Sequence, residues 1–90
     1  MSDKIRVGWL WFDNDTSLTL EDKVRRAAER YQNKFGHRPD VCYVHPQAMG
    51  VEEQQFGPMR VIAARHILPH HFWLGVAANG NGRSPVRAAV

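Results

Sequence analysis

The sequence predicts a single small α/β (α+β) domain in which one helix packs on a sheet of three or four strands. Three observations indicate this class: an aromatic-rich strand near the N-terminus, one amphipathic helix with capping signals, and short strand-like segments separated by turn residues. The chain has 90 residues, of which 43% are apolar, so we expect one domain with a modest core. The expected order of elements is β-α-β-β-β.

The first predicted strand is Ile5–Phe12, which is rich in aromatic residues. Both of its faces are apolar, because Trp9 and Trp11 alternate with Leu10 and Phe12. A strand of this kind is usually covered on both sides. The polar residues 13–17 then predict a turn.

A helix is predicted between Thr19 and Gly36. The Thr19 hydroxyl can cap the first turn, where two acidic residues favour the positive end of the helix dipole. Gly36 suits the left-handed residue that ends a helix, and Pro39 prevents the helix from resuming. Apolar residues recur at helical spacing and predict one buried stripe: Leu20, Val24, Ala27, Ala28, Tyr31 and Phe35.

Three further strands are predicted at residues 41–45, 59–65 and 72–76, with residues 46–58 as a loop. The strands on either side of the helix form a β-α-β unit, so we expect them to run parallel. Residues 77–90 contain Asn-Gly-Asn-Gly and Ser-Pro, which predicts a flexible tail. The folded domain is therefore expected to span residues 1–76.

Several classes of protein fit the sequence poorly. The longest apolar runs fall far short of the ~18 residues that span a bilayer, so we expect no membrane partner. The N-terminus has no apolar signal region, which favours a cytoplasmic protein. The single cysteine, Cys42, permits neither an internal disulfide nor a cysteine-based zinc site, and its place within a strand predicts burial.

The apolar surface of the predicted strands exceeds what one helix can cover. Trp9 and Trp11 lie on the first strand, and Trp73 adds a third indole on the last. Uncovered apolar patches usually mark interfaces. We therefore predict a homo-oligomer, most simply a two-fold dimer, with these three residues at the interface. The alternatives are a monomer closed by its own C-terminal half and an aromatic platform for single-stranded nucleic acid.

A basic row along the helix could contact the phosphates of a nucleic acid. The net charge is +3, but residues 1–76 carry ten basic against nine acidic side chains, so the tail holds most of the excess. Acidic residues one helical turn away can pair with parts of this row, which leaves an ordinary solvated helix face as the alternative. The candidate nucleic-acid-binding residues are Lys23, Arg26, Arg30, Lys34, Arg83 and Arg87.

Asp13, Asp15 and His45 follow the first and second strands of the predicted parallel unit. The carboxyl ends of such strands meet at one edge of the sheet, where ligand sites form in α/β proteins. Two carboxylates and an imidazole could bind a divalent metal that activates water, and the His70-His71 segment could supply a further ligand. The alternative is that His45 ends its strand in solvent, while His70 and His71 have structural roles or make a pH-dependent contact.

The segment Phe12-Asp13-Asn14-Asp15-Thr16 resembles the first motif of haloacid dehalogenase-type phosphatases. The resemblance implies that Asp13 is the nucleophile and Asp15 the general acid, with magnesium bound between them. It covers about ten residues, and the downstream lysine and acidic pair of that family cannot be placed in this chain. The alternative is an Asx-rich turn before a helix.

Three hypotheses of function follow from these patterns. The leading one is a non-catalytic, self-associating interaction or accessory module without a cofactor. The second is a nucleic-acid-binding module that uses the basic helix flank and the tail. The third is a small metal-dependent hydrolase or nuclease at Asp13, Asp15 and His45, which alone requires a divalent metal.

Overall fold

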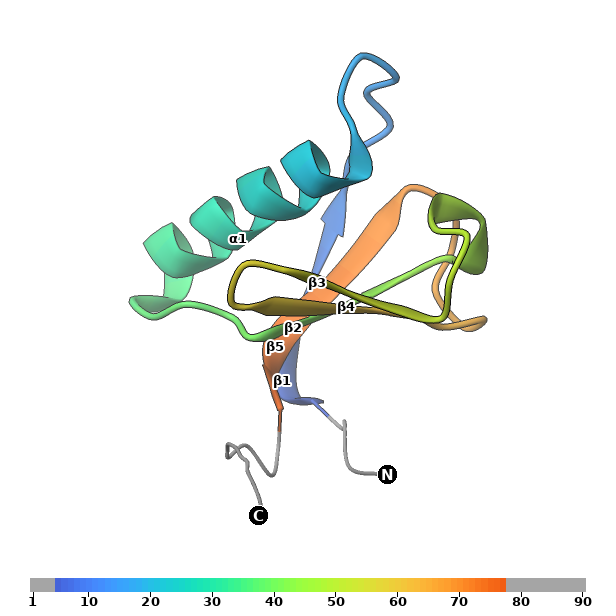
Figure 1. Ribbon diagram of the computed structural model, residues 1–90. Coiled ribbons are helices and arrows are strands. Elements are labelled where there is room, and N and C mark those ends of the chain that lie inside the picture. Colours follow the sequence, from blue (N-terminus) through green and yellow to red (C-terminus); the bar gives the residue numbers. More distant parts are fainter. Residues whose placement is uncertain (1–4, 78–90) are drawn as a thin grey trace.

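The computed structural model describes residues 5–77, and in it one helix lies on one side of a five-stranded mixed sheet (Figure 1). This confirms the predicted α+β class. The predicted tail lies outside the described residues from position 78 onward, as do residues 1–4. The elements in chain order are β1 (Ile5–Phe12), α1 (Leu20–Phe35), β2 (Val41–Val44), the 3-10 turn η1 (Pro46–Ala48), β3 (Glu53–Phe56), β4 (Met59–Ala63) and β5 (His71–Ala77).

The strands lie side by side in the order β1-β5-β2-β4-β3. β1 and β2 run parallel, as predicted, but β5 lies between them and is antiparallel to both. β2 and β4 form the directly paired parallel ladder. The carboxyl ends of β1 and β2 therefore emerge at the same end of the sheet, separated by the start of β5.

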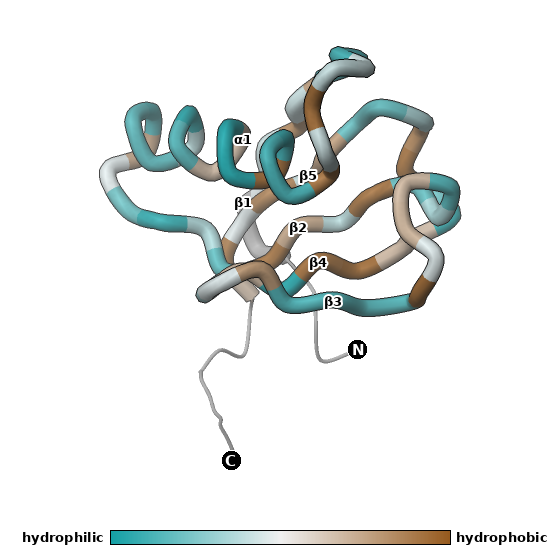
Figure 2. The backbone as a smooth tube through the Cα atoms, turned by 45° about the horizontal axis from the view of Figure 1, so that its top comes forward, coloured by the Kyte–Doolittle hydropathy of each residue, from teal (hydrophilic) through white to brown (hydrophobic). Residues whose placement is uncertain are grey.

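The sheet has one strand more than the sequence predicted, because Glu53–Phe56 lies within the segment expected to be a loop. This strand is polar and mostly exposed, so it lacks the apolar alternation of a core strand (Figure 2). It pairs with β4 through a two-residue turn at Gly57-Pro58, where Gly57 adopts a φ of 60°. Glycine at the first central position is typical of such hairpins.

Helix α1 begins and ends as its capping residues predict. The Thr19 hydroxyl accepts the N–H of Asp22 at 3.1 Å, and the Asp22 carboxylate accepts the N–H of Thr19 at 3.4 Å, which completes a capping box. Gly36 adopts a φ of 81° and donates its N–H to the carbonyl of Gln32. The local sequence thus sets the length of the helix.

The hydrophobic core lies between α1 and the sheet face beneath it. The helix contributes Val24, Ala27 and Tyr31, all buried. The strands contribute alternate residues, so that each places one of its two faces under the helix. These buried strand residues are Cys42, Val44, Met59, Val61, Phe72 and Leu74. Within residues 5–77, no helix is long and apolar enough to cross a membrane.

Candidate functional site

The sheet face opposite α1 presents an apolar row that crosses four strands. The register places Leu10 of β1 opposite Trp73 of β5, and Trp73 opposite Tyr43 of β2. Tyr43 is in turn opposite Ile62 of β4, while Phe12 lies on the same side as Leu10, two residues further along β1. No helix among residues 5–77 covers these five residues, which we call the open face (Figure 1).

Two residues of the open face project into solvent. Leu10 is 51% exposed and Phe12 is 53% exposed, whereas Tyr43, Ile62 and Trp73 are partly buried. Scattered exposed apolar residues are ordinary on a protein surface, but a contiguous group usually marks a contact site. The open face is such a group, because its members are neighbours in the register.

The indole of Trp73 lies against Gly8 on the open face. A Cβ atom built at Gly8 would lie 2.1 Å from Cζ2 of Trp73, so no side chain fits there. Gly8 is paired with Gly75 across the ladder, and its missing side chain leaves room for the ring. The sheet itself therefore shapes this part of the open face around one aromatic side chain.

The open face continues into the histidine pair His70-His71 at the start of β5. The Phe12 ring lies 5.0 Å from that of His71 and 6.4 Å from that of His70, measured between centroids. Nδ1 of His71 is 2.8 Å from the carbonyl of Pro69, which makes Nδ1 the protonated nitrogen of a neutral ring. His70 has a φ of 66°, the one positive value among the non-glycine residues described. This turn therefore holds both imidazoles beside Phe12.

Trp9 and Trp11 lie on the other side of β1, beneath the helix. The Trp9 ring makes edge contacts with Tyr31 and Phe35 at 6.2 and 6.3 Å. The guanidinium of Arg30 lies 5.9 Å from the centre of the Trp11 ring. Both indoles remain partly exposed at the border of the core. The helix thus packs on the side of β1 that carries Trp9 and Trp11, and of the three tryptophans only Trp73 belongs to the open face. An interface at Trp9 and Trp11 stays a prediction.

A second feature lies at the carboxyl ends of β1 and β2. A cavity of about 280 Å³ is lined by Asp13, Lys23, His45 and the His70-His71 pair, together with apolar residues. The structure therefore places Asp13, His45 and both later histidines around one space, as the parallel β-α-β unit suggests. Asp15, the second predicted carboxylate, is not part of the lining.

Both carboxylates stabilise the turn that follows β1. The Asp13 side chain is 5% exposed; its Oδ1 accepts the N–H of Asp15 at 3.0 Å, and its Oδ2 lies 3.8 Å from Nη1 of Arg26 without a hydrogen bond. Asp15 accepts hydrogen bonds from the hydroxyl and the N–H of Ser17 at 2.6 and 2.9 Å. These bonds, the hydroxyl first, lower the pKa of Asp15 below its ordinary value. The Asx-turn interpretation of this segment fits these contacts.

The predicted metal site has no matching geometry in the described part of the chain. Among residues 5–77, no three His, Cys, Asp or Glu side chains are arranged to hold a metal ion. Nδ1 of His45 accepts the N–H of Gln47 at 3.0 Å, so the proton of the neutral ring is on Nε2. Nε2 of His45 is then a hydrogen-bond donor rather than a metal ligand.

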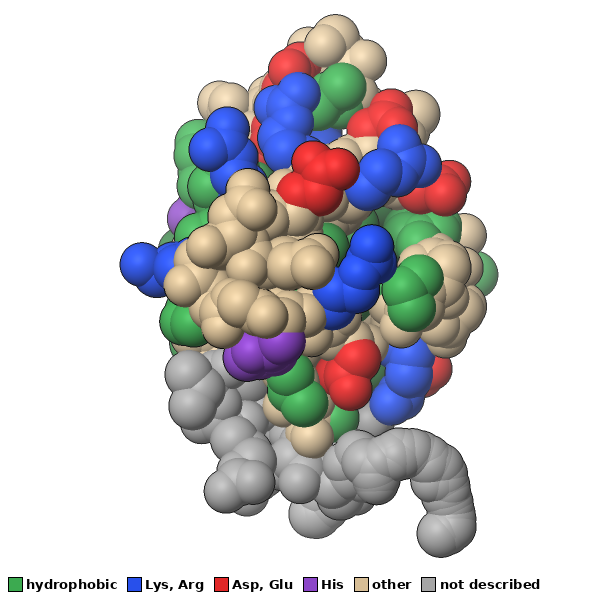
Figure 3. All heavy atoms as spheres, turned by 90° about the vertical axis from the view of Figure 1, so that its left-hand side faces the viewer, with side chains coloured by type: hydrophobic (Ala, Val, Ile, Leu, Met, Phe, Trp, Pro, Cys, Tyr) green, Lys and Arg blue, Asp and Glu red, His purple; other side chains and the backbone are tan. Residues whose placement is uncertain are grey.

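The basic flank of α1 is partly engaged by the chain itself. Arg26 faces Asp13, Arg30 lies over Trp11, and the Lys34 ammonium lies 5.8 Å from the Phe35 ring. On the face that Figure 3 shows, Lys and Arg side chains are interspersed with Asp and Glu. Of the other residues predicted to bind nucleic acid, Lys23 lines the cavity at the strand ends, and Arg83 and Arg87 lie outside the described residues.

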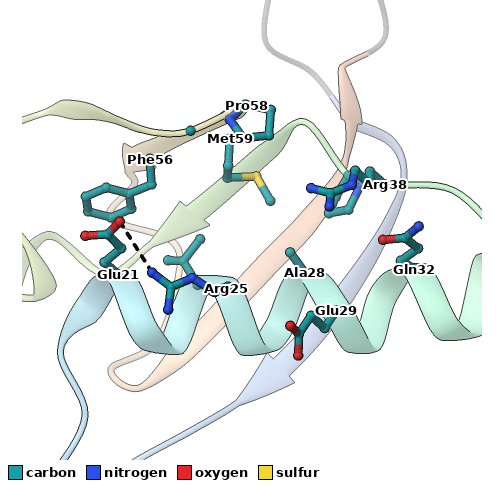
Figure 4. Close-up of a pocket in the computed structure, with 12 residues that line it drawn as sticks. Glu21, Arg25, Ala28, Glu29, Gln32, Arg38, Phe56, Pro58 and Met59 are labelled. Carbon is teal, nitrogen blue, oxygen red and sulfur yellow. Dashed lines mark ion pairs between the residues drawn. The ribbon is translucent and has the colours of Figure 1, made fainter.

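A groove that the sequence did not predict separates α1 from the β3–β4 hairpin (Figure 4). Its volume is about 330 Å³, and Val24 and Met59 contribute buried apolar surface to its lining. Phe56 also lines it, while Arg25 and Glu21 form an ion pair of 3.6 Å on the helix side. One wall of the groove is the β3–β4 hairpin, which forms because residues 53–56 are a strand. The sequence of β3 is polar, so the sequence did not predict this strand or the groove.

Cys42 is fully buried in β2, as its sequence position predicts. Burial raises the pKa of its thiol far above the ordinary value, so the thiolate does not form near neutral pH. The thiol is part of the core beneath α1, away from both cavities.

Comparisons of the chain with known protein families, with curated proteins and with solved structures found no match.

Proposed function

We propose that this protein is a non-catalytic interaction module that self-associates through its open face. The observation that carries the proposal is the exposure of Leu10 and Phe12 on the sheet face opposite α1. They adjoin Trp73, so apolar surface extends from the first strand of the sheet to its neighbour. Removing such surface from water stabilises a contact by roughly 25 cal/mol per Å².

The charge distribution of the face favours a second copy of the chain as the partner. Two charged groups lie beside Ile62 at one end of the apolar row: Glu53 is directly opposite it, and Arg60 is two residues before it on the same side of β4. They pair with each other at 3.0 Å. A two-fold axis packs the same patch on itself. Apolar residues then meet apolar residues, and no unpaired charge among those described has to be buried.

The polar groups considered for catalysis support a non-catalytic role. Asp13 and Asp15 are hydrogen-bonded within their own turn, and His45 accepts a backbone N–H at the start of η1. Each of these contacts stabilises the backbone where it changes direction.

The test is the molar mass of the protein in solution as a function of concentration, measured by analytical ultracentrifugation. Ile62→Lys should weaken the dimer by about tenfold or more, because it places an ammonium group within the apolar row. The fold should tolerate this change, because Ile62 is only partly buried and a long lysine side chain at this position can reach solvent.

Val76→Lys is the matched control, because Val76 is 36% exposed but lies on the helix side of β5, in alternation with Trp73. We expect the dimer of this variant to match that of the unmodified protein. A protein that stays monomeric up to about millimolar concentration would contradict the proposal, as would equal effects of the two substitutions.

A further inference from the structure

The two edges of the sheet differ in how they are protected. β3 is a four-residue strand with exposed Glu53, Gln54 and Gln55, and short polar edges resist the addition of another strand. β1 is eight residues long, and its segment Gly8–Phe12 contains neither a charge nor a proline. Among the described strands, β1 pairs only with β5. Within residues 5–77, the outer edge of β1 is therefore without a strand partner.

The hydrogen-bond pattern shows which backbone groups of β1 face this edge. The N–H of Asp13 donates to the carbonyl of His70 at 2.9 Å, which makes this opposed couple a hydrogen-bonded pair. Such pairs alternate along an antiparallel ladder, so Trp11 and Trp9 also bond to β5. The backbone N–H and C=O groups of the residues between them then point away from β5: Gly8, Leu10 and Phe12.

The neighbouring strand supports this alternation independently. Gly75 is opposite Gly8, and its carbonyl accepts the N–H of Asp40 at 3.0 Å on the β2 side of the sheet. The carbonyl of Gly75 therefore points away from β1. This is expected if Gly8 and Gly75 form a non-hydrogen-bonded pair of the β1–β5 ladder.

We propose that a second copy of this chain adds its own β1 antiparallel to this edge, with the two-fold axis at Leu10. Leu10 is then opposite Leu10 of the second copy, and Gly8 is opposite Phe12 of the second copy. All six outward-facing residues of the two segments fall in hydrogen-bonded pairs in this register. The two sheets join into one sheet of ten strands.

Self-complementarity is the reason for choosing a second copy over another peptide. An extended segment that pairs with itself across a two-fold axis must avoid like charges, and Gly8–Phe12 carries none. On the helix side, the same register sets Trp9 opposite Trp11 of the second copy, so the partly exposed borders of these indoles meet. Leu10 and Phe12 belong to both contacts, but the edge contact differs from packing of the open face because backbone groups at the strand edge form it.

Amide hydrogen exchange of the ¹⁵N-labelled full chain, followed by NMR at several protein concentrations, tests the proposal. The amides of Gly8, Leu10 and Phe12 should exchange about tenfold or more slowly at high concentration than at low concentration. Those of Trp9 and Trp11 should be protected at every concentration, because they bond to β5.

The results that overturn the proposal are specific. Rapid exchange of the three outward amides at all concentrations would show that no strand adds at this edge. Protection that does not depend on concentration would show that the chain itself occupies the edge. The Ile62→Lys variant distinguishes the contact through the open face from the contact through the strand edge. If concentration-dependent protection survives in this variant, the edge contact is supported even if the open face plays no part. If all protection is lost in this variant, an edge contact that forms independently of the open face is overturned.

A matched pair of substitutions at one position isolates the backbone group. Leu10→Thr retains the outward N–H, whereas Leu10→Pro removes it without breaking a bond to β5. Both variants lose the leucine side chain, so both dimers should be weaker than that of the unmodified protein, and the difference between the variants reports the backbone N–H. We expect the proline variant to lose the concentration-dependent protection of Gly8 and Phe12, while the threonine variant retains it at higher protein concentration. Equal protection in both variants would overturn the register. Thermal unfolding of both variants at low concentration shows whether each retains its fold.

Discussion

The two faces of the same sheet have opposite environments, although the same strands supply both. In β5, Phe72 and Leu74 are buried beneath α1, while Trp73 between them belongs to the open face. In β1, Trp9 lies on the helix side and its neighbour Leu10 is half exposed. Both faces are apolar, so hydrophobicity does not distinguish them. The difference is that residues 5–77 supply one helix of 16 residues, and one helix can lie on only one face of a sheet. That helix is about 10 Å wide and the strands are about 4.8 Å apart, so it covers only part of that face.

The largest expected effect comes from removing the same side chain on each face. Leu74→Ala should lower the free energy of unfolding by about 3 kcal/mol, because Leu74 is fully buried and its loss leaves a cavity under the helix. Leu10→Ala should lower it by about 1 kcal/mol or less, because half of that side chain is already in water. Denaturant unfolding at low protein concentration measures both values without a contribution from assembly.

Assembly should respond to these two changes in the opposite order. Leu10→Ala should weaken the dimer, whereas Leu74→Ala should leave the contact surface unchanged in any molecule that stays folded. If the two substitutions cost the same free energy of unfolding at low concentration, the open face is covered within the monomer, and the contrast between the faces disappears.

A smaller effect is expected from filling the space under Trp73. Gly8→Ala brings a methyl group to within 2.1 Å of the indole, so the ring must leave its place or the strand must shift. Overpacking of this kind costs about 1–3 kcal/mol. Gly50→Ala is the control, because no atom lies within 4 Å of a Cβ at Gly50. Unfolding of the two variants, with tryptophan fluorescence of the folded state, checks the difference; equal stability of both would show that Trp73 does not rest on Gly8.

The sequence predicted those parts of the fold that depend on local signals. Thr19 and Gly36 mark the helix ends through bonds within a few residues, and the apolar spacing identifies the buried stripe. Alternation along β1 likewise indicated that both of its faces are apolar. These features need no knowledge of distant segments, which is why one sequence sufficed to predict them.

The remaining features depend on contacts between distant segments. β3 is a strand because it pairs with β4, and the Gly57-Pro58 turn is the one signal of this pairing in the sequence. The insertion of β5 between β1 and β2 is a matter of topology that no local pattern records. Periodicity shows that the two faces of β1 are apolar, but not which one the helix takes. That choice placed Trp9 and Trp11 beneath α1 and left Leu10 and Phe12 uncovered.

The smallest expected effect concerns salt, and it follows from the edge contact. Arg26 and Arg30 lie on the side of α1 that faces β1, beside Asp13 and Trp11. If two β1 strands join, the two copies of α1 lie on the same face of the joined sheet, about three strand spacings or roughly 14 Å apart. The arginine side chains on their facing flanks then repel each other weakly.

Raising the sodium chloride concentration from about 20 to 500 mM screens this repulsion and should tighten the dimer roughly threefold. Arg30→Gln should reduce the response, and sedimentation at each salt concentration measures it. A dimer that weakens with salt would show that opposite charges meet at the contact, and the two helix flanks would then lie apart rather than side by side.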